Sequence, residues 1–307
     1  MPHEKGDVAL RQVAVPWLAR TLPAIGQGTW GMGRSPAHRA AEVEALRLGL
    51  SLGMTLIDTA EYYAAGGAER VVGEAIRGCR DQVFLVTKVW PCHARAQAVL
   101  ESVHASLHRL GTDHLDAVLL HWPTRSVPLA ETFRAFERLS QAGTIGAYGV
   151  SNFGPAWLAA ADAAGRPAFN QVPYSLADRR VENAILPHAQ SRDQVILAWS
   201  PLGHGRLRSW RAYRELAALA TARGITPHQA ALAFLASRAQ VVSIPKAARL
   251  DHVRANAAAG DISLSPAEIQ RLEAAFPRGP QSGFPILPPV DPAFRLLLWV
   301  ERRQHRV

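Results

Sequence analysis

Eight short apolar runs alternate along the chain with longer stretches that have helical periodicity. The runs occupy residues 23–30, 55–60, 82–89, 116–123, 144–152, 168–175, 195–203 and 241–247. Alternation of strand-like and helix-like segments predicts a parallel sheet covered by helices. Eight units are the number that closes into a barrel, and near-continuous apolar strands are typical of a sheet buried on both faces. The pattern therefore predicts the α/β class, as a (β/α)8 TIM barrel.

Local residue choices mark where the helices between these runs begin and end. Serine or threonine followed by proline predicts an N-cap and a first-turn proline, at Ser35-Pro36, Thr226-Pro227 and Ser265-Pro266. Glu268 is placed for a capping box with Ser265. Glycines after the periodic stretches predict helix ends, at Gly53, Gly111, Gly143, Gly165 and Gly224.

The two ends of the chain depart from the repeating pattern. Residues 11–15 and 18–22, around Pro16-Trp17, predict an extended hairpin that plugs the N-terminal end of the barrel. Residues 277–292 are rich in proline and glycine, and residues 293–307 predict a short amphipathic helix with a basic face. This tail is a docked helix, a dimer contact or a frayed end. We expect one barrel domain over residues 1–276, including the hairpin, followed by the proline-rich loop and short helix of residues 277–307.

Composition narrows the class of protein. With 307 residues and 48% apolar content the chain can bury a large core, and α/β barrels of this length are often single domains. Two cysteines, Cys79 and Cys92, are too few for a disulfide framework, which favours a reducing compartment. The first twelve residues have no apolar core typical of a signal peptide, and no run of about eighteen apolar residues is present. We expect a cytoplasmic protein that does not span a membrane.

The formal net charge of +9 comes from scattered arginines rather than from lysines. Only Lys5, Lys88 and Lys246 are lysines, and two of these three end predicted strands, where an ammonium of adjustable pKa differs from a permanently charged guanidinium. No basic stripe interleaved with aromatic residues is present, so we expect no nucleic-acid partner. The charge favours solubility and attraction for an anionic cofactor.

Four chemically active side chains lie at or just after the ends of predicted strands: Asp58, Tyr63, Lys88 and His121. The C-terminal ends of parallel strands meet at one rim of a barrel, where catalysis takes place in such folds. Lys88 has no other charge between residues 83 and 91, so a buried ammonium there requires an anionic partner, which Asp58 can provide. Taken singly, Asp58 is also compatible with a helix cap, Tyr63 with packing like that of adjacent Tyr62, and His121 with a hydrogen bond to the backbone.

Together these segments resemble the aldo-keto reductase superfamily from the GQGTWGMG turn to Asn256. The matching segments are DTAEYY, VTKVW, LDAVLLHWP, GVSNF, FNQVPYS, AWSPLG and SIPKA, in the family's order. The resemblance implies reduction of aldehydes or ketones with a nicotinamide dinucleotide, in a barrel that lacks the glycine-rich dinucleotide fold. Consistent with this, no G-x-G-x-x-G motif follows a predicted strand.

The resemblance also implies roles for the four side chains. A phenol with an ordinary pKa of about 10 is a reluctant proton donor at neutral pH, and a neighbouring ammonium favours the phenolate. Tyr63 is then the proton donor and Lys88 tunes it. Asp58 keeps Lys88 charged and oriented, and His121 helps to position the substrate oxygen.

Cofactor-binding residues follow from the same resemblance. Ser151, Asn152 and Gln171 are expected at the nicotinamide carboxamide, although the first two residues are also compatible with helix caps. Trp199 is expected to stack on the nicotinamide ring, with Ser200, Leu202 and Gly203 along the pyrophosphate. The remaining expected cofactor contacts are Gly28, Thr29, Trp30, Asp58, Lys246, Arg249, His252 and Asn256. The hydroxyl residues that often follow the lysine in relatives are replaced here by Ala247 and Ala248, yet the basic groups favour NADPH over NADH.

Three tryptophans after predicted strand ends, Trp30, Trp90 and Trp122, are expected to wall the substrate pocket unless they are ordinary core residues. Aromatic walls suit small apolar aldehydes, aromatic aldehydes or 2-oxo-aldehydes. A nicotinamide-binding sensor barrel with little turnover is the main alternative function. A metal-dependent isomerase is less favoured, because His104 and His108 share a helix face without an evident third ligand. We expect a monomer or a weak homo-oligomer.

Overall fold

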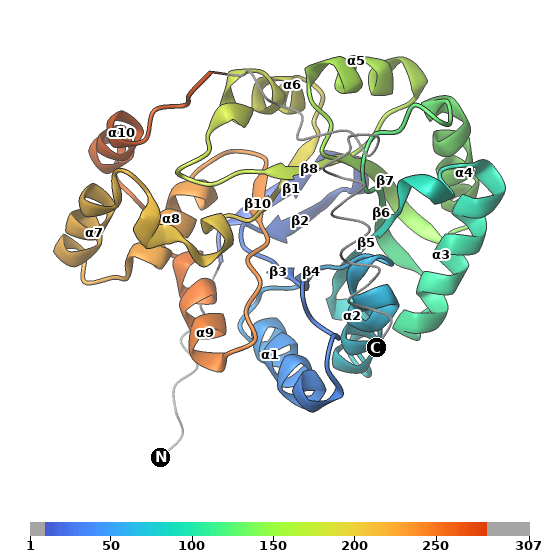
Figure 1. Cartoon of the computed structure of the whole chain (residues 1–307), viewed down its shortest axis with the longest axis horizontal. Helices are drawn as coiled ribbons and strands as arrows, with labels where there is room; N and C mark the ends of the chain where they lie inside the picture. Colours follow the sequence, from blue (N-terminus) through green and yellow to red (C-terminus); the bar gives the residue numbers. More distant parts are fainter. Residues whose placement is uncertain (1–9, 281–307) are drawn as a thin grey trace.

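The computed structural model describes residues 10–280 and shows the eight-stranded parallel sheet that the sequence predicts (Figure 1). The strands pair in chain order and are β3 (Gln27–Gly28), β4 (Leu56–Asp58), β5 (Phe84–Val89), β6 (Leu115–Leu120), β7 (Ile145–Ser151), β8 (Phe169–Pro173), β9 (Val195–Trp199) and β10 (Val241–Ser243). Isolated bridges from Ile25 to Ser243 and from Gly28 to Lys246 join the first strand to the last. The sheet therefore forms a nearly closed barrel. The predicted helix over residues 293–307 lies outside the described residues.

Helices surround the sheet on its outer side (Figure 1). They are α1 (Arg39–Ser51), α2 (Gly67–Ala75), α3 (Ala96–Leu110), α4 (Leu129–Gln141), α5 (Pro155–Ala164), α6 (Ile185–Ser191), α7 (Tyr213–Ala222), α8 (Pro227–Ala236), α9 (Leu250–Ala259) and α10 (Pro266–Ala275). The connection from β9 to β10 contains two of them, α7 and α8. None of the helices within residues 10–280 is both long and apolar enough to cross a membrane.

The first barrel strand is much shorter than residues 23–30, the predicted run. Only Gln27 and Gly28 pair as β3, and Pro23 belongs to the hairpin instead. At Gly28 a Cβ atom would lie 2.6 Å from the Ile244 carbonyl oxygen, so the backbones of the first and last strands approach each other where a side chain does not fit. This close approach closes the barrel.

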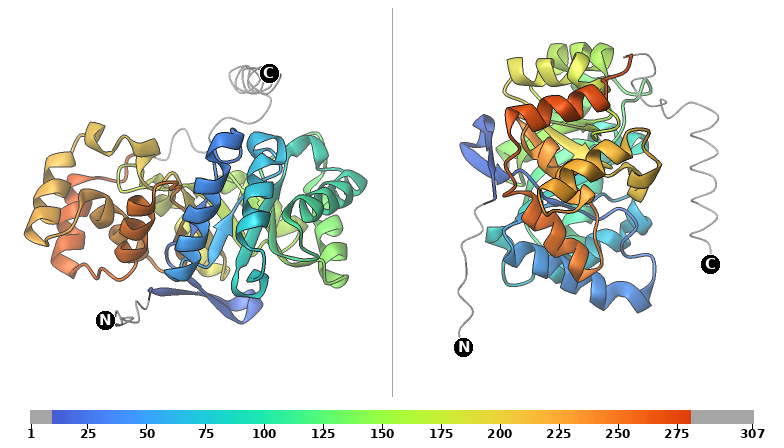
Figure 2. Two further views of the ribbon diagram at one scale, coloured as in Figure 1. Left: turned by 90° about the horizontal axis from the view of Figure 1, so that it is seen from below. Right: turned by 90° about the vertical axis from the view of Figure 1, so that its left-hand side faces the viewer.

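The predicted hairpin is present and covers the N-terminal end of the barrel (Figure 2). Its strands, β1 (Gln12–Val15) and β2 (Arg20–Pro23), pair antiparallel. Val13, Val15 and Leu22 belong to the same buried cluster as the inward-facing residues of the barrel, such as Phe84 and Phe169. Apolar burial therefore holds the plug in place.

Most of the predicted helix ends are confirmed, with two differences. Thr226 and Ser265 form capping boxes with Gln229 and Glu268. Ser35 precedes a short 3-10 turn before α1, but its side chain makes no capping hydrogen bond. Gly165 ends α5 with φ at 172°, which is extended rather than left-handed. Glycine is required there for space, because a Cβ atom would lie 2.5 Å from the Tyr148 hydroxyl.

Candidate active site

The four candidate catalytic side chains converge at the C-terminal rim of the barrel. Asp58 is the last residue of β4, Lys88 lies near the end of β5, and His121 directly follows β6. Tyr63 begins a short 3-10 turn, Tyr63–Gly66, in the connection from β4 to α2. All four side chains are buried. The strand ends thus deliver an acid, a phenol, an amine and an imidazole to one place.

Lys88 is the centre of this group. Its Nζ atom lies 2.8 Å from the Asp58 carboxylate, 2.8 Å from the Thr59 carbonyl oxygen and 3.1 Å from the Tyr63 hydroxyl. An ammonium has three protons to donate, and three oxygens are in place to receive them. The amine is fully buried, so this set of partners fixes both its charge and its direction.

Electrostatics keep Lys88 protonated. Burial by itself lowers the pKa of Lys88, but the charge of Asp58, with Tyr63 and the hydrogen bonds to both, raises that pKa above its ordinary value. Burial raises the pKa of the Asp58 carboxyl, while Lys88 and Gln171 oppose that rise. The arrangement favours an ion pair at neutral pH in which the ammonium faces the phenol.

The backbone around Tyr63 directs its side chain inward. Ala64 and Ala65 follow with φ of 50° and 51°, in the left-handed region, and form a tight turn before α2. The Tyr63 ring packs edge-on against Trp30 and His121, with centroid distances of 5.1 Å and 5.7 Å. Adjacent Tyr62 instead stacks on Trp90. Tyr62 is thus a packing residue, whereas Tyr63 reaches the amine.

His121 is held in its neutral form. Burial, with a smaller contribution from the Lys88 charge, places the pKa of His121 well below its ordinary value. The Nδ1 atom of His121 is buried and has no hydrogen-bond partner within the described part of the chain. Trp90 packs edge-on against the imidazole ring with centroids 4.9 Å apart. A neutral imidazole at this rim can orient a carbonyl oxygen.

Two glutamates that the sequence interpretation did not single out, Glu61 half-buried and Glu69 buried, support this geometry. Glu61 accepts hydrogen bonds from the Trp90 backbone amide at 2.6 Å and from the Ser102 hydroxyl at 2.7 Å. Glu69 accepts one from the Thr87 hydroxyl at 2.7 Å, beside Lys88 on β5. Glu69 stands among apolar residues on the inner face of α2, and a charged residue on an apolar face is a signal that was visible in the sequence.

An amide-rich platform lies next to the catalytic group. Gln171, on β8, donates to Asp58 at 2.7 Å, and the Ser151 hydroxyl donates to the Gln171 carbonyl oxygen at 3.1 Å. Asn152 donates to the His121 carbonyl oxygen at 3.1 Å and to the Ser151 hydroxyl at 3.0 Å. Gly154, rather than Ser151 or Asn152, occupies the N-cap of α5, so the helix-cap alternative is wrong.

Trp199 provides a flat aromatic surface at the end of β9. Its indole Nε1 donates to the Asn152 side-chain oxygen at 3.1 Å, which fixes the ring, and the side chain is half-buried. Asn152 itself has a φ of 64°, an uncommon conformation that turns its amide back toward Trp199. A half-buried indole beside neutral amides suits the nicotinamide ring with its carboxamide. The residues present therefore fit this part of the cofactor.

The loop after β9 contains Ser200, Leu202 and Gly203, the residues expected along the pyrophosphate. Ser200 and Gly203 have φ of 52° and 58°, and both Leu202 and Gly203 are partly exposed. The four arginines that follow, at positions 206, 208, 211 and 214, are exposed, as a solvated surface would be. Among the first-strand residues, Thr29 donates to the Asp58 carbonyl oxygen at 2.9 Å.

Basic residues gather at the beginning of α9, and one of them is already paired. Lys246 and His252 are exposed and Asn256 is buried. Arg249 forms a two-bond ion pair with Asp251, at 2.7 Å and 3.1 Å. This partner lowers the pKa of Asp251 to about 2. Any anion that approaches Arg249 would therefore compete with a carboxylate of the same chain.

The expected substrate-wall tryptophans differ in their surroundings. Trp30 is 45% exposed and lies against Tyr63, while Trp90 is half-buried and lies against His121. Trp122 is half-buried directly after His121. Across residues 10–280, no group of three His, Cys, Asp or Glu side chains is placed to hold a metal ion. His104 and His108 are both exposed on α3.

Comparison with known proteins agrees with this geometry. The Aldo/keto reductase family model matches residues 24–276. Methylglyoxal reductase YeaE of Escherichia coli is 45% identical over 262 residues, covering 84% of this chain and 92% of that protein. The crystal structure of an aldo/keto reductase from Klebsiella pneumoniae in complex with NADP and acetate is 43% identical, with a TM-score of 0.85, over 91% of this chain and all of that one. The thermostable aldo-keto reductase Tm1743, solved with the inhibitor epalrestat, has a TM-score of 0.80 at 38% identity, over 83% of this chain and 96% of that one.

Proposed function

The chain belongs to the aldo/keto reductase family, and on that premise we propose that it reduces aldehydes or ketones to alcohols with NADPH, using Tyr63 as the proton donor. The observation that carries the proposal is the position of the Lys88 ammonium, 3.1 Å from the Tyr63 hydroxyl and 2.8 Å from the Asp58 carboxylate. Reduction of a carbonyl places negative charge on its oxygen, which must receive a proton. Tyr63 supplies that proton, and Lys88 stabilises the phenolate that remains.

The other two residues, Asp58 and His121, position the reacting groups and do not transfer a proton. Asp58 keeps the ammonium charged and aimed at the phenol. His121 stays neutral, because burial and Lys88 lower its pKa, and it orients the carbonyl oxygen toward Tyr63. The nicotinamide supplies the hydride when it is bound.

For the cofactor, we propose that Ser151, Asn152 and Gln171 face the carboxamide, while Trp199 provides the stacking surface. Gly28, Thr29 and Trp30 border the same rim, and Ser200, Leu202 and Gly203 follow the pyrophosphate. Lys246, Arg249, His252 and Asn256 take the adenosine end, where the basic groups favour NADPH. The Klebsiella pneumoniae relatives crystallised with NADP and with NADPH support this choice.

For the substrate, we propose small 2-oxo-aldehydes, bound between Trp30, Trp90 and Trp122. The name of the Escherichia coli relative, methylglyoxal reductase, supports this class. Two of these indoles flank Tyr63 and His121 directly, so a small planar carbonyl compound fits between aromatic surfaces and the proton donor.

The test follows the absorbance of reduced nicotinamide with a panel of 2-oxo-aldehydes, aromatic aldehydes and ketones, using NADPH and NADH in parallel. We expect carbonyl-dependent oxidation that is fastest with 2-oxo-aldehydes and with NADPH. Equal affinity for the two cofactors would contradict the role of the basic residues near α9. A fast single turnover followed by almost no steady-state turnover would favour a cofactor-sensing barrel instead of a working reductase.

A further inference from the structure

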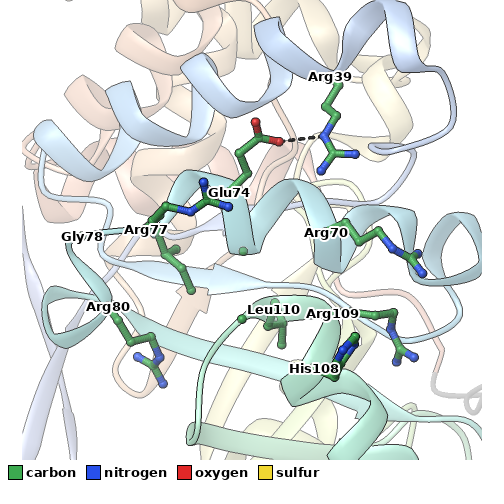
Figure 3. Close-up of a pocket in the computed structure, with 12 residues that line it drawn as sticks. Arg39, Arg70, Glu74, Arg77, Gly78, Arg80, His108, Arg109 and Leu110 are labelled. Carbon is green, nitrogen blue, oxygen red and sulfur yellow. Dashed lines mark hydrogen bonds and ion pairs between the residues drawn. The ribbon is translucent and has the colours of Figure 1, made fainter.

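A concave site lies on the outside of the barrel, between α1, α2 and α3 (Figure 3). Its cavity measures about 330 Å³. The charged and titratable side chains that line it are five arginines, one histidine and a single glutamate: Arg39, Arg70, Arg77, Arg80, Arg109, His108 and Glu74. No residue of the proposed catalytic or cofactor sites lines this cavity.

The positive charge of this arginine groove is only partly balanced. Glu74 accepts from Arg39 at 2.7 Å. Arg80 and Arg109 turn to carboxylates outside the lining, Asp116 and Glu69. Five guanidinium groups therefore surround one lining carboxylate. Two of the five, Arg80 and Arg109, are neutralised by carboxylates that do not line the groove.

The remaining two arginines, Arg70 and Arg77, are exposed, and neither forms a hydrogen bond or an ion pair with any part of the chain that the structure describes. In Figure 3, Arg77 and Arg80 lie toward one end of the groove, and Arg70, His108 and Arg109 toward the other. Two separate positive ends suit a ligand with negative charge at both of its ends. The groove thus presents unpaired donors to an incoming anion.

Glycines keep the groove open. At Gly73 a Cβ atom would lie 2.5 Å from the Leu110 carbonyl oxygen, so α2 and the end of α3 are in close backbone contact. Gly78 and Gly111, which also line the groove, have no atom within 4 Å of the place where a Cβ would be. At Gly78 and Gly111 the chain therefore adds no side chain to the groove between the arginines.

We propose that the arginine groove binds a small organic phosphate, with a bisphosphate favoured over a monophosphate. Guanidinium groups match the oxygens of phosphate in two-bond geometry and stay charged at every relevant pH. The site is a half-open hollow of small-molecule size rather than an extended basic stripe, which favours a metabolite over a nucleic acid. This site is separate from the rim where the cofactor phosphates are proposed to bind.

The test is calorimetric titration of the full chain with fructose 1,6-bisphosphate, and with inorganic phosphate and uncharged fructose for comparison. The titrations are run with and without saturating NADP+, which fills anion sites at the barrel rim. The groove variant is R70M/R77M, since both side chains are exposed and neither forms a hydrogen bond or an ion pair within residues 10–280. The matched control is R134M/R138M on α4, which removes the same charge from exposed positions outside the groove.

We expect fructose 1,6-bisphosphate to bind both with and without NADP+, more tightly than phosphate, while fructose does not bind. Affinity should fall at least about tenfold in R70M/R77M, since two charge-assisted contacts are lost. In the control variant the affinity should change less than about twofold.

Absence of binding to the native chain, binding that NADP+ abolishes, or equal affinity in both double variants would overturn the proposal. Tighter binding of an RNA duplex than of the bisphosphate would likewise overturn it, in favour of a nucleic-acid surface. Because titration without NADP+ does not depend on the reductase activity, its failure is distinguishable from failure of the proposed function.

Discussion

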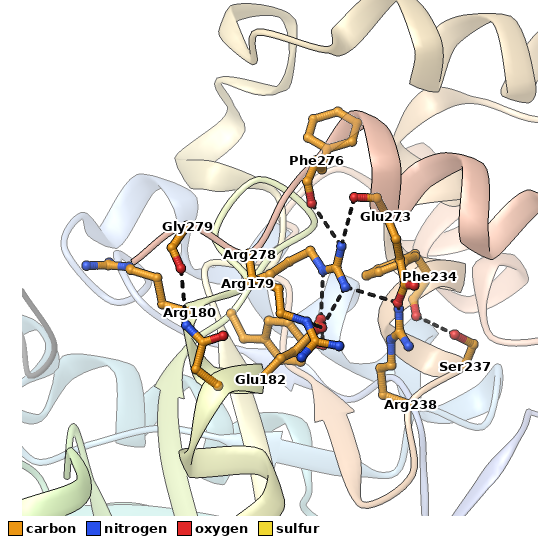
Figure 4. A network of polar contacts seen from close by, with 12 residues as sticks. Arg179, Arg180, Glu182, Phe234, Ser237, Arg238, Glu273, Phe276, Arg278 and Gly279 are labelled. Atoms are coloured by element: carbon orange, nitrogen blue, oxygen red, sulfur yellow. Dashed lines mark hydrogen bonds and ion pairs between the residues drawn. The ribbon is translucent and has the colours of Figure 1, made fainter. Parts of the chain in front are cut away.

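Two buried clusters in this barrel contain the same three kinds of group, a phenol, a cation and a carboxylate. They differ in which of the two charged groups forms a hydrogen bond with the phenol. At the rim, Tyr63 lies beside the Lys88 ammonium, which Asp58 holds in place. On the outer side of the barrel, Tyr174 donates its hydroxyl to Glu182 at 2.7 Å. Arg179 donates to the same carboxylate at 2.6 Å and 2.8 Å, next to Phe234 of α8 and Glu273 of α10 (Figure 4).

The partner of the phenol decides what each cluster can do. Burial, followed by the charge and the hydrogen bond of Glu182, raises the pKa of Tyr174 well above its ordinary value, so this phenol keeps its proton. At the rim the phenol faces a cation instead, which stabilises the phenolate. The outer cluster also ties distant segments together, because Arg179 donates to the Phe276 carbonyl oxygen at 2.9 Å and to Glu273 of α10 at 3.0 Å. The same groups thus build a structural clamp in one place and the proposed proton donor in the other.

Removing the hydroxyl of Tyr63 and that of Tyr174 in separate variants should affect turnover very differently. Tyr63→Phe should lower the turnover of carbonyl reduction by about two to four orders of magnitude, as expected for loss of a general acid, while NADPH affinity stays within about twofold. Tyr174→Phe is the matched control and should retain turnover. Steady-state kinetics with cofactor titration by fluorescence checks both. Unchanged turnover in Tyr63→Phe would falsify the proton-donor role.

Removing the charge of Arg179 should lower the free energy of unfolding but not the turnover. Arg179→Met leaves Glu182 buried without its main partner and should cost about 3–5 kcal/mol of the free energy of unfolding. Turnover of the folded variant should change by less than about twofold, since Arg179 does not contact the rim residues. Urea unfolding followed by tryptophan fluorescence measures the first quantity. Arg223→Met, which breaks a partly exposed pair with Glu268, is the control and should cost at most about 1 kcal/mol. If Arg179→Met lost no more free energy of unfolding than Arg223→Met, the cluster around Arg179 would not be a structural clamp.

The neutral state of His121 predicts a stability effect that appears in acid. The pKa of His121 is lowered in the folded chain by burial and by Lys88, so below pH 6.5 the unfolded chain binds a proton that the folded chain does not. Stability from this residue is present at pH 7 and is lost as the pH falls. The native chain should therefore lose more stability than His121→Gln between pH 7 and pH 5, by at most about 2 kcal/mol. Parallel urea unfolding of both proteins gives the difference, and equal losses would show that His121 titrates normally.

The smallest expected effect concerns the adenosine end of the cofactor. Asp251→Asn releases Arg249 from its ion pair and should strengthen NADPH binding by about two- to fivefold, because the pair is exposed and screened by solvent. NADH affinity should not change, since NADH lacks the 2′-phosphate. Fluorescence titration with both cofactors measures this. A parallel change for NADH would mean that Arg249 does not contact the 2′-phosphate.

The residues that meet at the C-terminal rim could be predicted from the sequence better than the contacts between the outer helices. The order of the strands and the convergence of Asp58, Lys88 and His121 were predictable, because strand ends of a parallel barrel meet whatever the helices do. The pairing of Arg249 with Asp251, two residues apart, was also within reach of the sequence. The clamp of Arg179 with Glu273 was not, because its partners are 94 residues apart and meet only through helix packing. For the same reason, the arginine groove became visible only once three helices were placed side by side.

In the mechanism that we propose, Lys88 acts on the reaction through Tyr63. Single-turnover reduction of a 2-oxo-aldehyde by NADPH, measured in the native chain, Tyr63→Phe, Lys88→Met and the double variant, tests it most directly. Each single variant should be slower by about two to four orders of magnitude, and the double variant should be hardly slower than Tyr63→Phe alone. Losses that multiply in the double variant would show that the amine and the phenol act independently, which contradicts the account.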